Sequence, residues 1–360
     1  MVSTVISLVL LGLLIIVHEY GHFLAARRAG VRVLRFSIGF GPRLLTWVRG
    51  ETEYAVSAIP LGGYVKMAGE QRGEQAHQPW EYLSKPIRTR AGIIVAGPLV
   101  NYLTALVGLW SMFVIGYPEL LPIVGKVFDD MPAQSAGLLR ADQIRAINGR
   151  SIRTWDEMTK LIHAAPGRSL TLTVEREGTT HSIAITPKAK TFTDPFGRLK
   201  TAGAIGIAPS GHFESYREGP LAAVGRAIEQ HNEWVSMTML ALWSMVTGRL
   251  SVRDSVTGPI GLVSLMTEAV SMGIAPVLYL VSLFSLSLAI FNLFPIPIFD
   301  GGHLFFLALE KWRGRPISVT VQERAAQVSL VLLVAFVLLI CINDVNRFGL
   351  WEKAKGLLRP

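Results

Sequence analysis

The stretch VISLVLLGLLIIVHEYGHFLAA, residues 5 to 26, decides the architecture of this chain. A helix of this length can cross the roughly 30 Å hydrocarbon core of a bilayer, and the stretch carries no charge before its last third. His18, Glu19 and His22 then bring three ionisable side chains into five positions. Ionisable groups are costly within a membrane span and mark functional sites. The stretch therefore predicts a chemical site within a membrane helix.

The spacing of these residues indicates which chemistry. A helix places His18 and His22 on one face, where both can ligate one metal ion, and Glu19 lies beside them to take a proton from water. The bare His-Glu-x-x-His pattern arises by chance in roughly 1% of such chains, so its membrane setting carries the argument. A signal peptide is the main alternative, but the stretch lacks a basic n-region and cleavage near Ala25 or Ala26 would remove the motif.

The composition agrees with a membrane protein. Half of the residues are hydrophobic, only 17% are charged, and the mean hydropathy is +0.40. Charge-free runs predict four spans with both chain ends on the same side, at residues 1–17 continuing to about 26, 91–118, 269–299 and 325–343. The one cysteine, Cys341, falls in the fourth span, so no disulfide within the chain is possible.

Lysine and arginine in the connections predict the orientation. Residues 27–90 hold 11 Lys/Arg against 5 Asp/Glu, and residues 310–324 hold 4 against 2. These two connections are expected in the cytoplasm, so the long middle segment and both termini are expected outside it. The net charge of +9 is then explained by topology rather than by nucleic-acid binding. No phosphate loop, nucleophile elbow or nucleic-acid motif stands out.

A third metal ligand is expected at the depth of the two histidines. His18 lies about 24 Å from the outer end of the first span, in the cytoplasmic third of the core. The third span runs inward and ends with NLFPIPIFDGGH, residues 292 to 303. Pro295 and Pro297 must break the helix there, and non-helical backbone at membrane depth is tolerated only where protein buries it or it lines a wet cavity. Asp300 is the candidate ligand.

The first cytoplasmic segment predicts a β-hairpin. EYAVSAI, residues 53 to 59, alternates imperfectly, Pro60 with Gly62 and Gly63 makes a turn, and YVKM follows as a second strand. The open edge of such a hairpin could pair with a further extended strand. A hairpin that only faces the solvent is the alternative.

Motifs spread over nearly the whole chain resemble one known family. They are HEYGH, LGGYVKM at 61–67, AGPLVN at 96–101, a PDZ-like middle segment, GPIGL at 258–262 and NLFPIPIFDGGH. The sequence resembles the site-2 protease family of intramembrane zinc metalloproteases, in its bacterial RseP-like branch, with a single PDZ domain where several relatives have two.

The resemblance implies a zinc centre. His18, His22 and Asp300 would hold Zn²⁺, and Glu19 would act as general base and acid. His303 is expected to support the site rather than ligate, because three protein ligands leave the fourth position open for water.

Two asparagines are candidate substrate-binding residues. Asn292 matches the family asparagine that contacts the substrate backbone near the metal. Asn101 matches the small-residue and asparagine pattern of the second span. A hydrogen bond that packs two helices explains Asn101 equally well.

The middle segment resembles a circularly permuted bacterial PDZ domain. Its features are AGL at 136–138, a turn at Asp142, a helix from Trp155, and strands at 170–176 and 181–186. It departs from the family at Arg140 and Ala141, where a glycine often precedes the aspartate, which puts the turn geometry in doubt. Such a domain could bind the end of a substrate cut by another protease, or exclude substrates with bulky outer domains.

The expected fold is a polytopic α-helical membrane protein of four transmembrane helices, with a membrane-associated β-hairpin on the cytoplasmic side and an inserted extracytoplasmic PDZ domain, mainly β with α. The expected segments are the first span at 1–28, the cytoplasmic or re-entrant hairpin segment at 29–90, the second span at 91–118, the PDZ domain at 119–190, a linker at 191–218, an amphipathic interfacial helix at 219–250, the third span at 269–303, the fourth at 325–343 and an extracytoplasmic tail at 344–360.

Two further expectations concern the helix at 219–250 and the histidines outside the motifs. Trp234 and Trp243 on a helix interrupted by charges favour an interfacial helix at 219–250, with a fifth span as the alternative. The five histidines outside the motifs fall in polar segments and are expected at the surface, at positions 77, 163, 181, 212 and 231.

The expected function is hydrolysis of peptide bonds within single-span membrane proteins of the bacterial inner membrane, after a first cut by another protease. Family substrates are anti-sigma factors and signal-peptide remnants. The alternatives are an inactive membrane scaffold that recruits partners through its PDZ domain, and a transporter. The lipid bilayer and membrane substrates are the expected partners, and nucleic acid is not.

Overall fold

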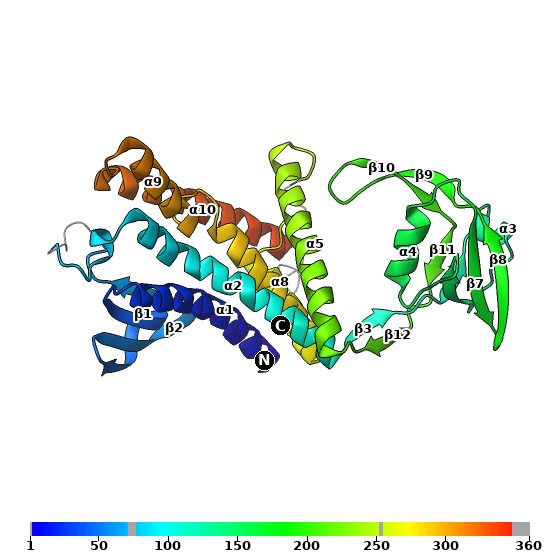
Figure 1. Cartoon of the computed structure of the whole chain (residues 1–360), viewed down its shortest axis with the longest axis horizontal. Coiled ribbons are helices and arrows are strands. Elements are labelled where there is room, and N and C mark those ends of the chain that lie inside the picture. Colours follow the sequence, from blue (N-terminus) through cyan, green and yellow to red (C-terminus); the bar gives the residue numbers. More distant parts are fainter. Residues whose placement is uncertain (1, 71–76, 252–254, 348–360) are drawn as a thin grey trace, which may run out of the picture. The chain divides into compact units, whose positions relative to one another are not determined.

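A computed structural model describes residues 2–70, 77–251 and 255–347 of the 360-residue chain. The chain forms two compact units. The first contains residues 1–112, 224–236 and 252–360, and the second contains residues 113–223 and 237–251. Most of the helices in Figure 1 belong to the first unit, and most of the short strands belong to the second.

Four helices of the described chain are long and apolar enough to cross a membrane. They lie at the four predicted positions and are α1 (Val2–Arg28), α2 (Ile87–Ile115), α8 (Ile274–Asn292) and α10 (Val319–Arg347). α2 begins four residues before the expected boundary, because its first turn contains Arg88 and Arg90 and the prediction stopped at charges. Helices suit this setting because all their backbone groups pair within the segment.

The surface of α10 requires a lipid environment. Its apolar side chains point outward, with Val331 68% exposed, Leu332 65% and Leu339 67%. A contiguous apolar stripe of this kind is not stable against water. The protein is therefore a membrane protein, in agreement with its composition.

The predicted hairpin pairing is wrong in detail. β1 (Val33–Arg49) pairs with β2 (Thr52–Met67), and the chain turns at residues 50 and 51. Phe36 pairs with both Val65 and Tyr54, so the first part of β1 lies between the two segments expected to be neighbours. Gly39 and Gly41, at φ of 89° and 85°, let β1 bend so that its second part also pairs with β2. The sequence-based prediction assumed pairing across the nearest turn and missed β1.

The third span is broken, and the break was predicted. α8 ends at Asn292, the prolines follow, and α9 (Asp300–Arg313) starts a new helix. Arg90 of α2 forms a bidentate ion pair with Glu310 of α9, with Nη2 2.5 Å and Nη1 3.3 Å from its carboxylate oxygens. This largely buried pair ties the helix that carries Asp300 to α2.

The GPIGL motif begins a short helix that the sequence analysis did not predict. In α7 (Pro259–Met272), the backbone N–H groups of Gly258 and Gly261 donate to the fully buried carboxylate of Asp344 on α10, at 3.2 and 2.9 Å. A Cβ at Gly258 would lie 2.6 Å from this carboxylate. Asp344 thus caps α7 and belongs to α10, although it was assigned to the tail; residues 348–360 of that tail lie outside the described residues.

Part of α5 (Pro220–Val246) packs in the first unit and corrects one prediction. His231 is only 1% exposed, and its ring meets Tyr102 of α2 edge-on at 4.3 Å. Trp234 meets Tyr279 of α8 in the same manner at 5.0 Å. His231 is therefore a core residue, and the expectation of a surface histidine is wrong because the helix face that carries it is buried.

The second unit has a four-stranded antiparallel sheet with the order β6-β5-β7-β8. Its strands are β5 (Gln143–Ile147), β6 (Arg150–Ser151), β7 (Leu170–Arg176) and β8 (Thr179–Ile185). The helices are α3 (Pro132–Ser135) and α4 (Trp155–His163), which begins where a helix was expected. Ile144, Met158 and Leu172 are almost fully buried in the shared core. The unit is PDZ-like, with short strands and helices around one apolar core.

The segment expected as a linker, residues 191–218, contains strands. Two of them complete the second unit by pairing with strands at its beginning: β11 (Ile207–Pro209) with β4 (Val124–Val127), and β12 (Phe213–Tyr216) with β3 (Tyr117–Leu120). β9 (Lys188–Thr193) and β10 (Leu199–Ala204) form a hairpin. Glycine, proline and threonine suggested a linker, but these strands are short and their partners lie far away in sequence.

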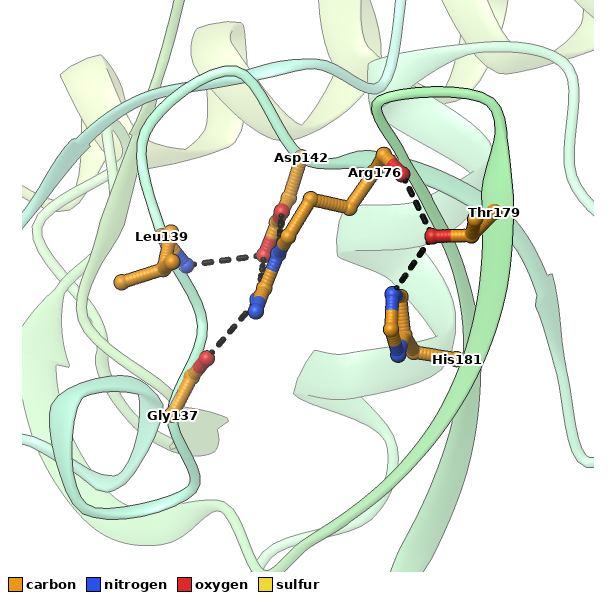
Figure 2. A network of polar contacts seen from close by, with 6 residues as sticks. All are labelled: Gly137, Leu139, Asp142, Arg176, Thr179 and His181. Atoms are coloured by element: carbon orange, nitrogen blue, oxygen red, sulfur yellow. Dashed lines mark hydrogen bonds and ion pairs between the residues drawn. The ribbon is translucent and has the colours of Figure 1, made fainter.

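A buried carboxylate organises the turn before β5 (Figure 2). Asp142 is fully buried, accepts two hydrogen bonds from Arg176 at 2.7 and 2.8 Å, and accepts one from the Leu139 backbone N–H at 2.8 Å. Burial raises the pKa of Asp142, but these bonds outweigh it and leave the pKa below its usual value. Ala141 adopts φ of 72°, so the turn has the left-handed geometry that suits the family's glycine.

We expect Asp142→Asn to destabilise the second unit by about 2 kcal/mol at pH 7, because it removes a charge-assisted bond and leaves Arg176 poorly paired. A lowered folded-state pKa contributes stability above pH about 4 and loses it as the pH falls through that pKa. The difference between variant and wild type should therefore shrink below pH 4. Pulsed hydrogen exchange of β5 and β7 in urea measures both effects. An equal difference at pH 7 and pH 3 would contradict this account.

Candidate metal centre

Two histidines of α1 face each other across one helical turn. The Nε2 atoms of His18 and His22 lie 3.2 Å apart, and both residues are buried, at 7% and 8% exposure. The i to i+4 spacing accounts for this arrangement. Two nitrogen atoms that can donate lone pairs to a metal therefore lie side by side on one face of an apolar helix.

The carboxylate of Asp300 completes the cluster. Its Oδ2 lies 3.0 Å from Nε2 of His18 and 3.3 Å from Nε2 of His22. The break after α8 permits this, because Asp300 starts a new helix and is not held on the axis of α8. Gly301 and Gly302 pack their backbone onto the loop before them, where an added Cβ would lie 2.2 to 2.3 Å from its carbonyl oxygens. The DGG sequence thus lets the first turn of α9 lie directly on this loop.

The spacing and the chemistry of these groups fit a zinc ion. Zinc bonds of about 2.0 to 2.2 Å in tetrahedral geometry place neighbouring ligand atoms about 3.3 Å apart. The three observed separations are 3.0, 3.2 and 3.3 Å. Oδ2 of Asp300 is buried and has no hydrogen-bond donor among the described residues. Within the described chain, these three residues form the one cluster suited to hold a metal.

α2 approaches the cluster so closely that only glycine fits. A Cβ added to Gly97 would lie 2.3 Å from Nε2 of His22 and 2.9 Å from Cε1 of His18. On α1, a Cβ added to Gly21 would lie 2.4 Å from the Ala96 carbonyl oxygen. The small residues of AGPLVN and the glycine of HEYGH therefore allow the two helices to touch. The sequence analysis noted these motifs but did not identify this contact.

The backbone of α2 also orients one histidine. Nδ1 of His22 lies 2.9 Å from the carbonyl oxygen of Ile93. Nδ1–H of His22 donates to this carbonyl, which leaves the lone pair on Nε2 directed at the cluster.

Glu19 follows His18 on α1 and lies against β2. It is half-buried, and a Cβ at Gly63 would lie 3.7 Å from its Cγ. The strand segment LGGYVKM therefore passes beside Glu19, at the position where β2 has no side chain.

The remaining predicted site residues lie in different settings. Asn101 is fully buried, and its Nδ2 is 3.4 Å from Nδ1 of His18. Asn292 donates from Nδ2 to the Leu288 carbonyl of its own helix at 3.0 Å. His303 is exposed in the first turn of α9 and is not in the three-residue cluster.

Comparison with known proteins identifies the family. The model of "Peptidase family M50" matches residues 6–336. The chain belongs to peptidase family M50. A relative from Rhizobium meliloti, named as a zinc metalloprotease, is 35% identical, with 94% of this chain and 95% of the relative covered. The regulator of sigma-E protease RseP of Escherichia coli is 30% identical, with 94% and 97% covered.

The family membership confirms the main sequence-based predictions. This M50 chain is a site-2 type intramembrane protease, and its cofactor is zinc. The scaffold alternative is not favoured. A solved PDZ domain from Listeria monocytogenes is 24% identical and covers 26% of this chain and 88% of its own, with a TM-score of 0.20.

We expect Gly97→Ala to prevent zinc binding, because its methyl group would lie 2.3 Å from Nε2 of His22 and would displace the ring. Zinc in the purified variant should fall from about one per chain towards zero, as measured by mass spectrometry of the metal. Gly92→Ala is the matched control, since nothing lies within 4 Å of a Cβ at that position of the same helix. Full zinc content in Gly97→Ala would contradict the close contact between α2 and the cluster.

Proposed function

We propose that His18, His22 and Asp300 are the zinc ligands and that Glu19 is the general base of an intramembrane endopeptidase. The observation that carries this proposal is the mutual spacing of the three ligand atoms, from 3.0 to 3.3 Å. Three protein ligands leave a coordination position open, as catalytic zinc sites require. The zinc ion, when bound, supplies Lewis-acid polarisation of the scissile carbonyl and makes water more acidic.

Glu19 performs the proton transfers in this mechanism. It follows His18 directly on α1, so its carboxylate reaches the neighbourhood of the cluster without joining it. It accepts the proton of the attacking water and later delivers that proton to the leaving amine. The apolar surroundings of α1 strengthen the electrostatic interactions of Glu19 in both proton transfers, because a low dielectric screens charges poorly.

The substrate must leave its helical conformation to be cut, because helix carbonyls are already hydrogen-bonded. We propose that β2 binds the unwound segment by strand addition. Residues 63–65 of β2 pair with β1, no second strand of the described chain pairs with these three residues, and Gly63 lies beside Glu19. A peptide added along these residues would lie next to the general base.

The substrates we propose are single-span membrane proteins that another protease has already shortened, such as anti-sigma factors and signal-peptide remnants. The resemblance to the RseP-like branch supports this proposal, and one relative is named "Regulator of sigma-E protease RseP". The PDZ-like unit then binds the new peptide end or excludes substrates with bulky outer domains. Asn292 remains a candidate contact to the substrate backbone. In the structure, its side-chain amide donates a hydrogen bond to a carbonyl of its own helix.

We propose an inner-membrane topology of four spans, with the connections at 27–90 and 310–324 in the cytoplasm and the PDZ-like unit and both termini outside. The excess of lysine and arginine in the first and third connections supports it. The apolar tip of the β-hairpin, with Leu44 and Leu45 both 65% exposed and Val48 72%, supports contact with lipid. α5 is proposed to lie along the interface.

We expect Glu19→Gln to retain about one zinc per chain and to lose activity by about 10³-fold, because it removes the proton acceptor and keeps the ligands. Purified protein in detergent is tested on a single-span model substrate, with zinc content as the second readout. His22→Ala and Asp300→Asn should lose both zinc and cleavage.

The same assay tests the demand for shortened substrates. A substrate with a folded outer domain should be cut more slowly than its truncated form, and removal of that domain should restore cleavage. Activity retained by Glu19→Gln would contradict the mechanism, and equal cleavage of the two substrates would contradict the pre-cleavage requirement.

Single cysteines in a Cys341→Ser background test the topology. We expect a membrane-impermeant maleimide to label Ser210→Cys from outside intact cells and Arg315→Cys only after the cells are opened. Trp47→Cys at the hairpin tip should remain shielded until detergent is added, and Val65→Cys should cross-link to a cysteine near the scissile bond. Labelling of Arg315→Cys from outside would reverse the orientation.

A further inference from the structure

The Asn101 side chain ends against the rear nitrogen of His18. It comes from α2, it has no exposed surface, and its Nδ2 lies 3.4 Å from Nδ1 of His18. This environment disagrees with the predicted role in substrate binding, because a side chain enclosed on all sides does not meet a substrate. The residue it faces is one of the proposed zinc ligands, so any action of Asn101 passes through His18.

The position of the proton on the His18 ring determines which kind of atom Nδ1 needs as its partner. Its Nε2 faces the cluster, 3.0 Å from Oδ2 of Asp300 and 3.2 Å from Nε2 of His22. A histidine that ligates through Nε2 has its lone pair there and its hydrogen on Nδ1. An N–H in a buried site needs an acceptor, since an unpaired buried donor is costly. The equivalent nitrogen of His22 has one in the Ile93 carbonyl.

The amide of Asn101 can supply the missing acceptor. Its Oδ1 is buried and has no hydrogen-bond donor among the described residues, while its NH₂ group faces Nδ1 of His18. The oxygen and nitrogen of an amide have nearly the same size, and their assignment follows from the hydrogen bonds around them. Rotating the amide by half a turn brings the unpaired oxygen to the imidazole N–H.

We propose that Asn101 is a positioning residue for the metal centre, whose Oδ1 accepts the hydrogen bond of His18 Nδ1–H and thereby fixes the ring orientation and tautomer for zinc binding. This inference rests on the proposed zinc role of His18. It gives the two histidines different supports from the same helix, a backbone carbonyl for His22 and a side-chain amide for His18. Such partners of metal-bound histidines raise metal affinity by about 10- to 100-fold.

Helix packing does not account for the side chain. Ser285 of α8 donates from Oγ to the backbone carbonyl oxygen of Asn101 at 2.8 Å. This bond uses the main chain of residue 101, so it persists with any side chain at that position. The packing role considered in the sequence analysis therefore belongs to Ser285 and to the backbone.

Three variants of the full chain in detergent test the proposal, with the zinc dissociation constant measured by competition with a chelator. Asn101→Ala should bind zinc 10- to 100-fold more weakly, because His18 loses its acceptor. Asn101→Asp should stay within a few-fold of wild type, because a carboxylate oxygen accepts the same hydrogen bond. Ser285→Ala should also stay near wild type, because it removes only the bond between α2 and α8.

Three results would overturn the proposal: wild-type zinc affinity in Asn101→Ala, an equal loss in Ser285→Ala, or a loss in Asn101→Asp as large as in Asn101→Ala. A raised KM with unchanged zinc affinity in Asn101→Ala would return the residue to substrate binding. Failure of the proposed function has a separate signature, in which His18→Ala keeps the zinc affinity of the wild type.

Discussion

The candidate metal centre of this protein depends on a close contact between two apolar helices. α1 and α2 touch at Gly21 and Ala96, and Gly97 leaves no room for a methyl group beside the histidine rings. Because the helices meet here, the backbone of α2 reaches His22 through the Ile93 carbonyl, and its side chains reach His18 through Asn101. A larger residue at this contact would separate the histidines from the groups that hold their outer nitrogens.

The carboxylate of Asp300 needs partners, because a charge at membrane depth is stable only when other groups interact with it. The prolines after α8 end that helix and allow α9 to begin with Asp300, which then meets both histidines. At the other end of α9, the ion pair between Arg90 and Glu310 ties the same helix to α2. The three candidate metal ligands therefore come from two helices that α2 holds together.

Sequence patterns succeeded where the signal is local and failed where partners are distant. The break at Pro295 and Pro297 was predicted because proline acts on its own helix turn. The pairing of the hairpin was not, because β1 passes between two segments of β2. Strands β11 and β12 were taken as linker because their partners begin the same unit. The sequence analysis predicted His231 at the surface, because composition does not indicate that α5 packs on α2.

By itself, the sequence determined the class of molecule and its chemistry, since apolar run lengths, HEYGH and the proline-broken Asp300 depend only on residue types and short spacings. Only the tertiary structure decided that three candidate ligand atoms from distant segments lie about 3 Å apart, and that the buried Asn101 faces His18. The reason is physical. A spacing along the chain fixes which face of a helix a side chain occupies, whereas packing fixes what that face meets.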